Sequence, residues 1–155
     1  MFLCNAALIY LIIVTGGQQI QQECRTYVLN HGYLKPGEVY VSAAGRLPCQ
    51  KVIHAVGPSW INGRCNEEKT LHTAIREVLL AAEKHQLSSV ALPALSSGNM
   101  GFPIDKCTKI IVTAVKEFLD SHQQTCVKTV SLVDQSDSVL QQFCTSLRTM
   151  FGELQ

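Results

Sequence analysis

The chain is organised around the segment Val90-Ala-Leu-Pro-Ala-Leu-Ser-Ser-Gly-Asn-Met-Gly-Phe-Pro103. Residues 90–95 are apolar and bounded by turn residues, which predicts a strand buried in a parallel sheet. Residues 96–101 are small and include two glycines, so the backbone can turn sharply and approach a ligand closely. Pro103 stands at a natural first helical position. One helical face then follows from the spacing of Ile104, Ile111, Val112 and Val115.

A strand, a glycine-bearing loop and a helix N-terminus together predict an anion site. Free backbone N–H groups and the positive end of the helix dipole point at the same place. We therefore expect a phosphate-bearing ligand at the 96–101 loop. Such units also occur in α/β proteins that bind nothing, so the loop alone leaves that alternative open. No Lys-Ser or Lys-Thr follows the loop and no G-x-G-x-x-G pattern is present, which argues against a nucleotide-hydrolysing P-loop and a dinucleotide-binding fold.

Composition limits the class of protein. The 155 residues are 46% apolar and 16% charged, which is typical of one globular domain with a sizeable core. A net charge of +1 argues against the broad basic surface that binds DNA or RNA directly. The seven cysteines are scattered, without a C-x-x-C pair. This pattern favours reduced intracellular thiols over a disulfide framework or a zinc site, so we expect no metal.

The first fourteen residues are atypical. Residues 6–14 are apolar but too few to span a bilayer as a helix. They have the length of a signal-peptide core, yet no basic residue precedes them and the first is Arg25. Three interpretations stay open: a buried strand in a shortened domain, a cryptic signal peptide, or a foreign N-terminus produced by truncation or splicing. We divide the chain into this segment, 1–14, and a domain at 15–155.

The remaining pattern alternates between strands and helices. Residues 38–42, 51–56 and 127–133 have the pattern of strands, and residues 18–30, 67–85, 104–121 and 137–151 that of helices. The 59–66 loop carries the only tryptophan, Trp60. Alternation predicts a layered α/β fold, whose ligands sit at the carboxyl ends of the strands, where the 96–101 loop falls.

Other residues with chemical potential have plainer interpretations. His54 lies inside an apolar strand and is expected to be a hydrogen-bonded core histidine. Cys107 lies one turn into the helix after the loop, where the dipole can lower a thiol pKa, but packing is the favoured role. Asp134 ends a strand, where it can contact a ribose or adenine, but capping a turn is the favoured role. No histidine pair, carboxylate pair or Ser-His-Asp order stands out, so we expect no catalytic residues.

Several segments together resemble the macrodomain family, in particular the modules of the vertebrate multi-macrodomain ADP-ribosyltransferases (the macro-PARP group). They are Gly16-Gly-Gln-Gln-Ile-Gln-Gln-Glu-Cys24, Pro36-Gly-Glu-Val-Tyr-Val-Ser-Ala-Ala-Gly-Arg-Leu-Pro48, Val52-Ile-His-Ala-Val-Gly-Pro58 and Leu92-Pro-Ala-Leu-Ser-Ser-Gly-Asn-Met-Gly-Phe-Pro103. The resemblance covers about residues 15–151. It implies a three-layer α/β/α fold with a mixed central sheet that binds ADP-ribose, free or on modified proteins. It further implies a monomeric module of the nucleus, the cytoplasm or both, without cofactor or membrane contact.

The resemblance also assigns residues. The loop Ser96, Ser97, Gly98, Asn99, Met100 and Gly101 would wrap the diphosphate and distal ribose through backbone N–H groups. Phe102 and Pro103 would fix the loop onto its helix, and Asp134 would lie near the adenosine part. Two residues depart from the family pattern: Asn99 replaces an aliphatic residue, and Met100 replaces the aromatic that packs on the distal ribose. Methionine can cover that surface but does not stack as a ring does.

The larger departure from the family pattern is at the N-terminus of the chain. Family members open with strands, an Asn-Ala-Ala-Asn-like motif, an early adenine-binding aspartate and a glycine-rich first loop. Here only Cys4-Asn5-Ala6-Ala7 has some similarity to the motif, and the segment up to Gly16-Gly17 is too short for the first loop. We therefore expect an N-terminally truncated macrodomain that lacks its first strands. Three functions remain: a binding module, which we favour; an ADP-ribosyl hydrolase, which would need the missing loop; and a nonbinding fragment or isoform that acts through protein contacts.

Overall fold

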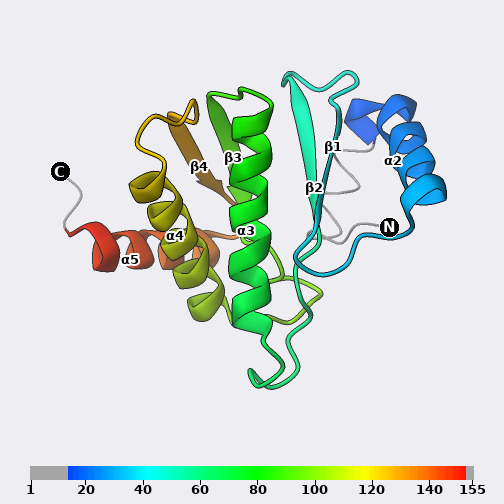
Figure 1. The fold of residues 1–155 in the computed structure, drawn as a ribbon. Coiled ribbons are helices and arrows are strands. Elements are labelled where there is room, and N and C mark those ends of the chain that lie inside the picture. Colours follow the sequence, from blue (N-terminus) through cyan, green and yellow to red (C-terminus); the bar gives the residue numbers. More distant parts are fainter. Residues whose placement is uncertain (1–13, 153–155) are drawn as a thin grey trace.

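The computed structural model describes residues 14–152 of the chain. The apolar segment therefore lies outside the described residues except for Val14, and so does Asn5. The described elements are α2 (Gln18–His31), β1 (Val39–Ala43), β2 (Lys51–Ala55), α3 (Glu67–Lys84), β3 (Ser89–Pro93), α4 (Ile104–Ser121), β4 (Thr129–Val133) and α5 (Asp137–Phe151). Figure 1 shows their arrangement. The bounds expected from the sequence agree with the helices to within one residue, and the strands begin or end up to two residues away.

The two central helices form because their apolar residues recur at helical spacing. In α3 the apolar positions Leu71, Ala74, Ile75, Val78, Leu79 and Ala82 are all buried. In α4 Ile111 and Val112 are buried, but Ile104 is 37% exposed, so its expected inward position is wrong. Ile104 is the first residue of α4 and lies beyond the end of the packed interface. Periodicity therefore predicts the helical face but not where contact with the core begins.

The strands form two pairs of opposite kind. β1 and β2 are antiparallel, with Tyr40 opposite His54, whereas β3 and β4 are parallel, with Pro93 opposite Val133. The expected mixture of strand directions is therefore confirmed. Within residues 14–152 the pairs form two separate two-stranded sheets, so the single continuous sheet is not found there. No strand precedes α2 in this described part of the chain.

Helices cover both faces of the antiparallel pair. On one face, Tyr40 of β1 lies against Tyr27 of α2, with 4.2 Å between the ring centroids. On the other face, Ile53 and Ala55 of β2 pack against the main apolar core. Since α3 contacts β1, β2 and β3, it joins the two strand pairs. The layered arrangement of helix, strands and helix expected from the sequence is visible in Figure 1.

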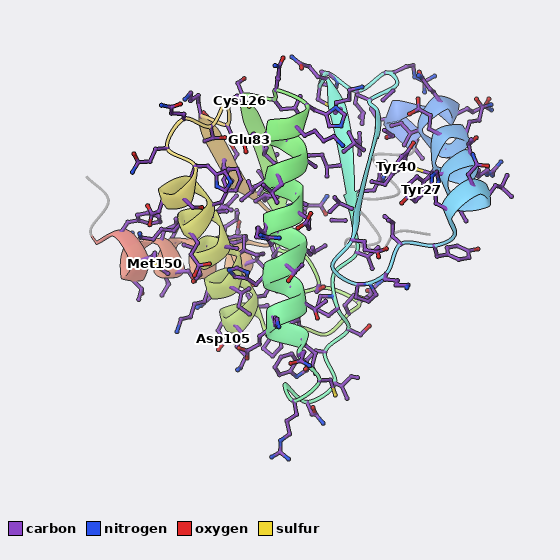
Figure 2. The ribbon with its side chains drawn as sticks, viewed as in Figure 1. Tyr27, Tyr40, Glu83, Asp105, Cys126 and Met150 are labelled. Atoms are coloured by element: carbon purple, nitrogen blue, oxygen red, sulfur yellow. The ribbon has the colours of Figure 1, made fainter. Side chains whose placement is uncertain are left out.

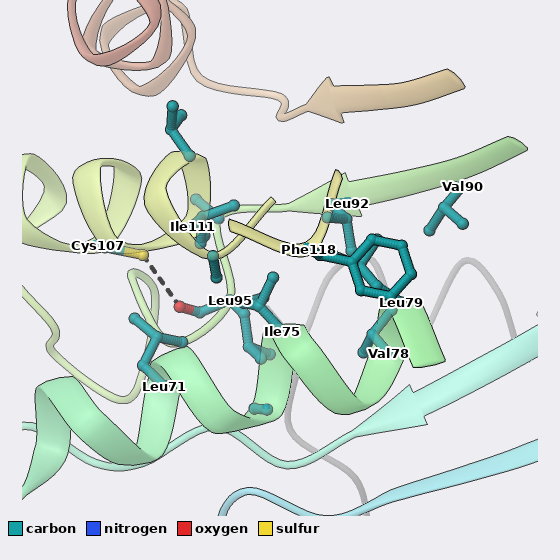
Figure 3. Packing of buried hydrophobic residues seen from close by; sticks show 14 of the residues in the cluster. Leu71, Ile75, Val78, Leu79, Val90, Leu92, Leu95, Cys107, Ile111 and Phe118 are labelled. Carbon is teal, nitrogen blue, oxygen red and sulfur yellow. Dashed lines mark hydrogen bonds between the residues drawn. The ribbon is translucent and has the colours of Figure 1, made fainter. Parts of the chain in front are cut away.

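The main core lies between α3, α4 and the parallel pair. Figure 3 shows Leu71 and Ile75 of α3 directed toward Leu95 and Ile111. Phe143 of α5 belongs to the same cluster. Burial of this apolar surface supplies the main driving force for folding and fixes the relative positions of β3 and α4. The loop between these two elements is therefore held between two rigid supports. Among the described residues, no helix is both long enough and apolar enough to cross a membrane.

Candidate functional site

The candidate site lies at the carboxyl ends of the parallel strands. Because Pro93 and Val133 are paired, the chain leaves β3 at Ala94 and β4 at Asp134 from the same edge. The N-terminal ends of α3 and α4 lie at the lower end of the molecule in Figure 1. Figure 2 shows Asp105, in the first turn of α4, at that same end. The structure thus brings the 94–103 loop to the helix terminus that the sequence predicted for it.

The first half of the loop is a tight turn over residues 94–97. The Ser97 N–H donates to the Ala94 carbonyl at 3.1 Å, and the Ser97 hydroxyl donates to the same oxygen at 2.7 Å. Ser96, inside this turn, has φ +74°, a left-handed conformation that favours glycine. The side chain of Ser97 is therefore a turn stabiliser, and Ser96 holds local backbone strain.

The second half is a turn over residues 98–101. The Gly101 N–H donates to the Gly98 carbonyl at 2.9 Å, and the Phe102 N–H donates to the Ser96 carbonyl at 3.0 Å. Gly101 has φ +70°, which glycine adopts without strain. The N–H groups of Ser97, Gly101 and Phe102 are therefore occupied within the loop. This narrows the sequence-based expectation that the backbone of the whole 96–101 loop donates to a ligand.

Three consecutive donors remain in the middle of the loop, and the N–H of the buried Ser96 is a fourth without a hydrogen bond among the described residues. Among residues 14–152, no hydrogen bond uses the main-chain N–H of Gly98, Asn99 or Met100. Gly98 and Asn99 are exposed and Met100 is half-buried. Successive free N–H groups in a turn form a concave anion site, and the α4 N-terminus, whose Pro103 cap makes no side-chain hydrogen bond, adds the positive end of a helix dipole. The 98–100 amides are the strongest chemical feature of the site.

Two buried side chains hold the loop on its supports. Phe102 is 2% exposed and packs against Trp60 with 4.7 Å between ring centroids. The Cys107 thiol is fully buried and donates to the Leu95 carbonyl at 3.1 Å, the contact drawn as a dashed line in Figure 3. The position of Phe102 is consistent with the fixing role that the resemblance implied. The packing role expected for Cys107 is confirmed by its burial.

The hydroxyl oxygen of Ser96 is buried without a hydrogen-bond partner among the described residues. The side chain of Ser96 is 3% exposed. A buried hydroxyl without a partner costs about 1 to 3 kcal/mol. Together with the left-handed backbone at the same residue, this makes Ser96 the least relaxed position of the loop. Such strain clusters at ligand sites.

Asp134 has an internal role in this structure. Its carboxylate accepts the Ser136 N–H at 3.0 Å, which organises the turn into α5. It lies at the same strand edge as the 94–103 loop because its strand pairs with β3. The capping role expected from the sequence is confirmed, and the contact with an adenosine group stays a prediction.

His54 belongs to a separate cluster under α2. Its Nε2 lies 2.8 Å from the Ser42 hydroxyl and 3.6 Å from the Cys24 sulfur. Burial lowers the pKa of His54 to about 4, against an opposite effect of the Glu23 carboxylate. Burial and then the Glu23 charge raise the pKa of the Cys24 thiol. Both groups are therefore neutral near pH 7, which argues against a thiolate–imidazolium nucleophile. The expected hydrogen bonding of His54 is confirmed, although the residue is half-buried and lies outside the main core cluster.

Sequence reasoning missed the loop that lies beside the site. The Trp60 N–H donates to the Met100 carbonyl at 2.8 Å, and the Ser59 hydroxyl lies 3.5 Å from the Met100 sulfur. The Lys106 ammonium lies 5.5 Å from the centre of the Trp60 ring. The only signal in the sequence was the single tryptophan in a loop rich in turn residues. The 59–66 loop thus braces Met100 from outside the 96–101 segment.

Comparisons with protein families and known proteins found several matches. A family model described as "Macro domain" matches residues 10–111. Human "Protein mono-ADP-ribosyltransferase PARP14" is 40% identical over 140 residues, which are 88% of this chain but 8% of that protein. An "O-acetyl-ADP-ribose deacetylase" of Citrobacter rodentium is 38% identical over 104 residues, 67% of this chain and 59% of that protein. The chain thus spans only part of the length of each relative.

A solved structure shows the same fold. It is a mutant macrodomain of Oceanobacillus iheyensis with ADPR, and it superposes on this chain with a TM-score of 0.84 at 27% sequence identity. The superposition covers 92% of this chain and 77% of that one.

Proposed function

The chain belongs to the macro domain family, and on that premise we propose that it is a module that binds ADP-ribose through the main-chain N–H groups of Gly98, Asn99 and Met100. The observation that carries the proposal is that these three consecutive donors have no partner in the described part of the chain, while the flanking N–H groups of Ser97 and Gly101 do. A free nucleotide or a modified protein presents the same chemical group to them, a diphosphate flanked by two riboses.

The chemistry of the loop suits a diphosphate. Each N–H···O⁻ hydrogen bond to a charged oxygen contributes about 1.5 to 3 kcal/mol, and the α4 dipole favours the same negative charge. A local grip of this kind needs no basic surface, which fits a net charge of +1. We propose that Met100 faces the distal ribose and that Asp134 approaches the adenosine part. The Oceanobacillus macrodomain with ADPR supports the ligand class by its fold, and the placement of Met100 and Asp134 is our proposal.

A variant at the loop tests the proposal. We expect titration calorimetry of the chain with ADP-ribose to show saturable heat and the Gly98→Glu variant to show none, because a carboxylate would enter the phosphate site. The matched control is Gln123→Glu, which adds the same charge in the exposed turn at the other end of α4 and should leave the affinity unchanged. If the unmodified chain gives no heat at millimolar ADP-ribose, it is a nonbinding module. If Gly98→Glu binds normally, the ligand lies elsewhere.

Hydrolysis is the second candidate function. It is favoured by the similarity to a protein called O-acetyl-ADP-ribose deacetylase. His54, the histidine weighed in the sequence analysis, lies in the α2 cluster and not beside the free amides. Release of ADP-ribose from a modified protein faster than in buffer, and lost in Gly98→Glu, would establish an enzyme. We propose binding without hydrolysis. In that case ADP-ribose is released from the modified protein at the same rate with the chain as in buffer alone.

A further inference from the structure

Glu67 is a buried carboxylate away from the ligand-binding loop. It is the first residue of α3 and is 2% exposed, whereas acidic residues are rarely buried unless they are paired. Its partners are not cations but main-chain N–H groups of the preceding loop. One oxygen accepts the N–H groups of Ile61, Asn62 and Gly63 at 3.0 to 3.2 Å, and the other accepts that of Cys65 at 2.6 Å.

These bonds hold the loop in a curled shape. Four donors around one carboxylate fix the direction of four peptide groups. Gly63 has φ +77°, and a Cβ there would lie 2.8 Å from the Trp60 ring, so the loop folds closely over that ring. Burial alone would raise the pKa of Glu67, but the N–H donors outweigh it and lower the pKa to about 2. The carboxylate is therefore charged at any physiological pH.

Trp60, which directly precedes the curled loop, contacts the ligand-binding turn. The Trp60 N–H donates to the Met100 carbonyl, and the Gly101 N–H of the same peptide group donates to the Gly98 carbonyl. The Met100–Gly101 peptide is thus fixed on both sides, by Trp60 from outside and by Gly98 from inside. Because this peptide closes the 98–101 turn, its orientation determines where the free N–H groups of Asn99 and Met100 point.

We propose that Glu67 is a positioning residue for the ligand-binding turn: its carboxylate holds the 61–65 backbone in the shape that brings the Trp60 N–H to the Met100 carbonyl. It touches no ligand and acts through Trp60. The proposal rests on the proposed function for its effect on ADP-ribose, but the linkage between Glu67 and Met100 is independent of any ligand.

The test variant is Glu67→Gln, which keeps the size of the side chain and replaces one acceptor oxygen with a donor. Its matched control is Glu77→Gln, the same change on the same helix at a residue whose carboxylate, among residues 14–152, is hydrogen-bonded to Arg76 alone. In the ligand-free full chain, we expect Glu67→Gln to shift the amide resonances of Asn99, Met100 and Gly101 and to speed hydrogen exchange at Trp60. Glu77→Gln should change neither. A purely local role in starting α3 would leave residues 99–101 unshifted.

The affinity measurement completes the test. We expect Glu67→Gln to weaken ADP-ribose binding by about tenfold, the value of one good hydrogen bond, and Glu77→Gln not to weaken it. If the wild-type chain binds and residues 99–101 do not shift in Glu67→Gln, the positioning role is wrong. If the wild type does not bind but those residues shift, the positioning role stands and the ligand assignment is wrong.

A milder variant keeps the test possible if Glu67→Gln does not fold. The exposed Asn62 side chain accepts the Arg64 N–H at 2.9 Å, so Asn62→Ala loosens the same loop without removing the buried charge. If Glu67→Gln does not fold, Asn62→Ala should still shift residues 99–101. Unchanged resonances in Asn62→Ala would then overturn the proposal.

Discussion

Gly57 and Ser96 face each other so closely that a Cβ atom on Gly57 would overlap the hydroxyl of Ser96. The same Cβ would lie 2.9 Å from the Leu95 side chain. Gly57 follows β2 of the antiparallel pair, and Ser96 belongs to the candidate site loop that follows β3 of the parallel pair. The two sheets are separate in the described part of the chain. The contact between Gly57 and Ser96 therefore joins a loop of one sheet to a loop of the other.

Replacing Gly57 by alanine should disturb the site by steric overlap alone. We expect Gly57→Ala to destabilise the protein by about 1 to 3 kcal/mol, as overpacking does, and to weaken ADP-ribose binding because Ser96 must move. Urea unfolding and calorimetry measure the two effects. Gly32→Ala is the comparison: nothing lies within 4 Å of its Cβ, so only the backbone strain of a left-handed residue remains and ligand affinity should not change. Unaltered stability of Gly57→Ala would show that the two loops do not touch in solution.

Two adjacent serines should respond in opposite directions. We expect Ser96→Gly to stabilise the chain by about 1 kcal/mol, since it removes left-handed strain and an unpartnered buried hydroxyl. Ser97→Gly should destabilise it by about 1 kcal/mol, because the Ser97 hydroxyl donates to the Ala94 carbonyl. Thermal unfolding of both variants checks the signs. Destabilisation by Ser96→Gly would mean that the hydroxyl has a partner in solution.

Stability should fall in mild acid because of His54. Its pKa drops from 6.5 to about 4 on folding, so the unfolded chain takes up the proton first as the pH falls. The contribution is therefore fully present above pH 6.5 and is lost between pH 6.5 and about 4, by about 3 kcal/mol in total. We expect His54→Gln to flatten the unfolding free energy across this window. An equal slope in wild type and His54→Gln would contradict the burial of a neutral imidazole.

Glu67 should affect stability in a lower pH range. Its folded pKa, about 2, lies below the ordinary value of 4.5, so its contribution is present above pH 4.5 and is lost as the pH falls toward 2. We expect the stability difference between wild type and Glu67→Gln to be constant from pH 7 to 5 and to shrink below that. Urea unfolding at several pH values measures it. A difference that already shrinks between pH 7 and 5 would mean that the N–H donors do not hold the carboxylate.

The sequence predicted those features that depend on local chemistry. Helical periodicity identified α3 and α4, and the small residues between β3 and Pro103 predicted a loop at a helix N-terminus. The exposure of Ile104 was not predictable in this way, because periodicity does not reveal where a neighbouring element ends. The separation of the strands into two pairs was equally hidden, since strand neighbours are decided by long-range pairing.

The details of the site depend on contacts between distant residues. Which loop amides are free follows from the bonds of Gly101 to Gly98 and of Phe102 to Ser96, and residue types alone do not distinguish Ser97 from Asn99. The hydrogen bond between Trp60 and Met100 joins residues forty positions apart. In the sequence, Glu67 looks like an ordinary acidic residue in the first turn of a helix. Only the folded chain shows that the Trp60 N–H donates to Met100 and that the Glu67 carboxylate accepts the N–H groups of the loop that follows Trp60.

We propose above that the amides of residues 98–100 donate hydrogen bonds to the diphosphate of ADP-ribose. The most direct measurement is a titration of the ¹⁵N-labelled chain with ADP-ribose, followed by the amide resonances of the loop. We expect saturable shifts that are largest at Gly98, Asn99 and Met100 and smaller at Ser97, Gly101 and Phe102, whose N–H groups are already bonded within the loop. Saturable binding that leaves the Gly98, Asn99 and Met100 amides unshifted would contradict it.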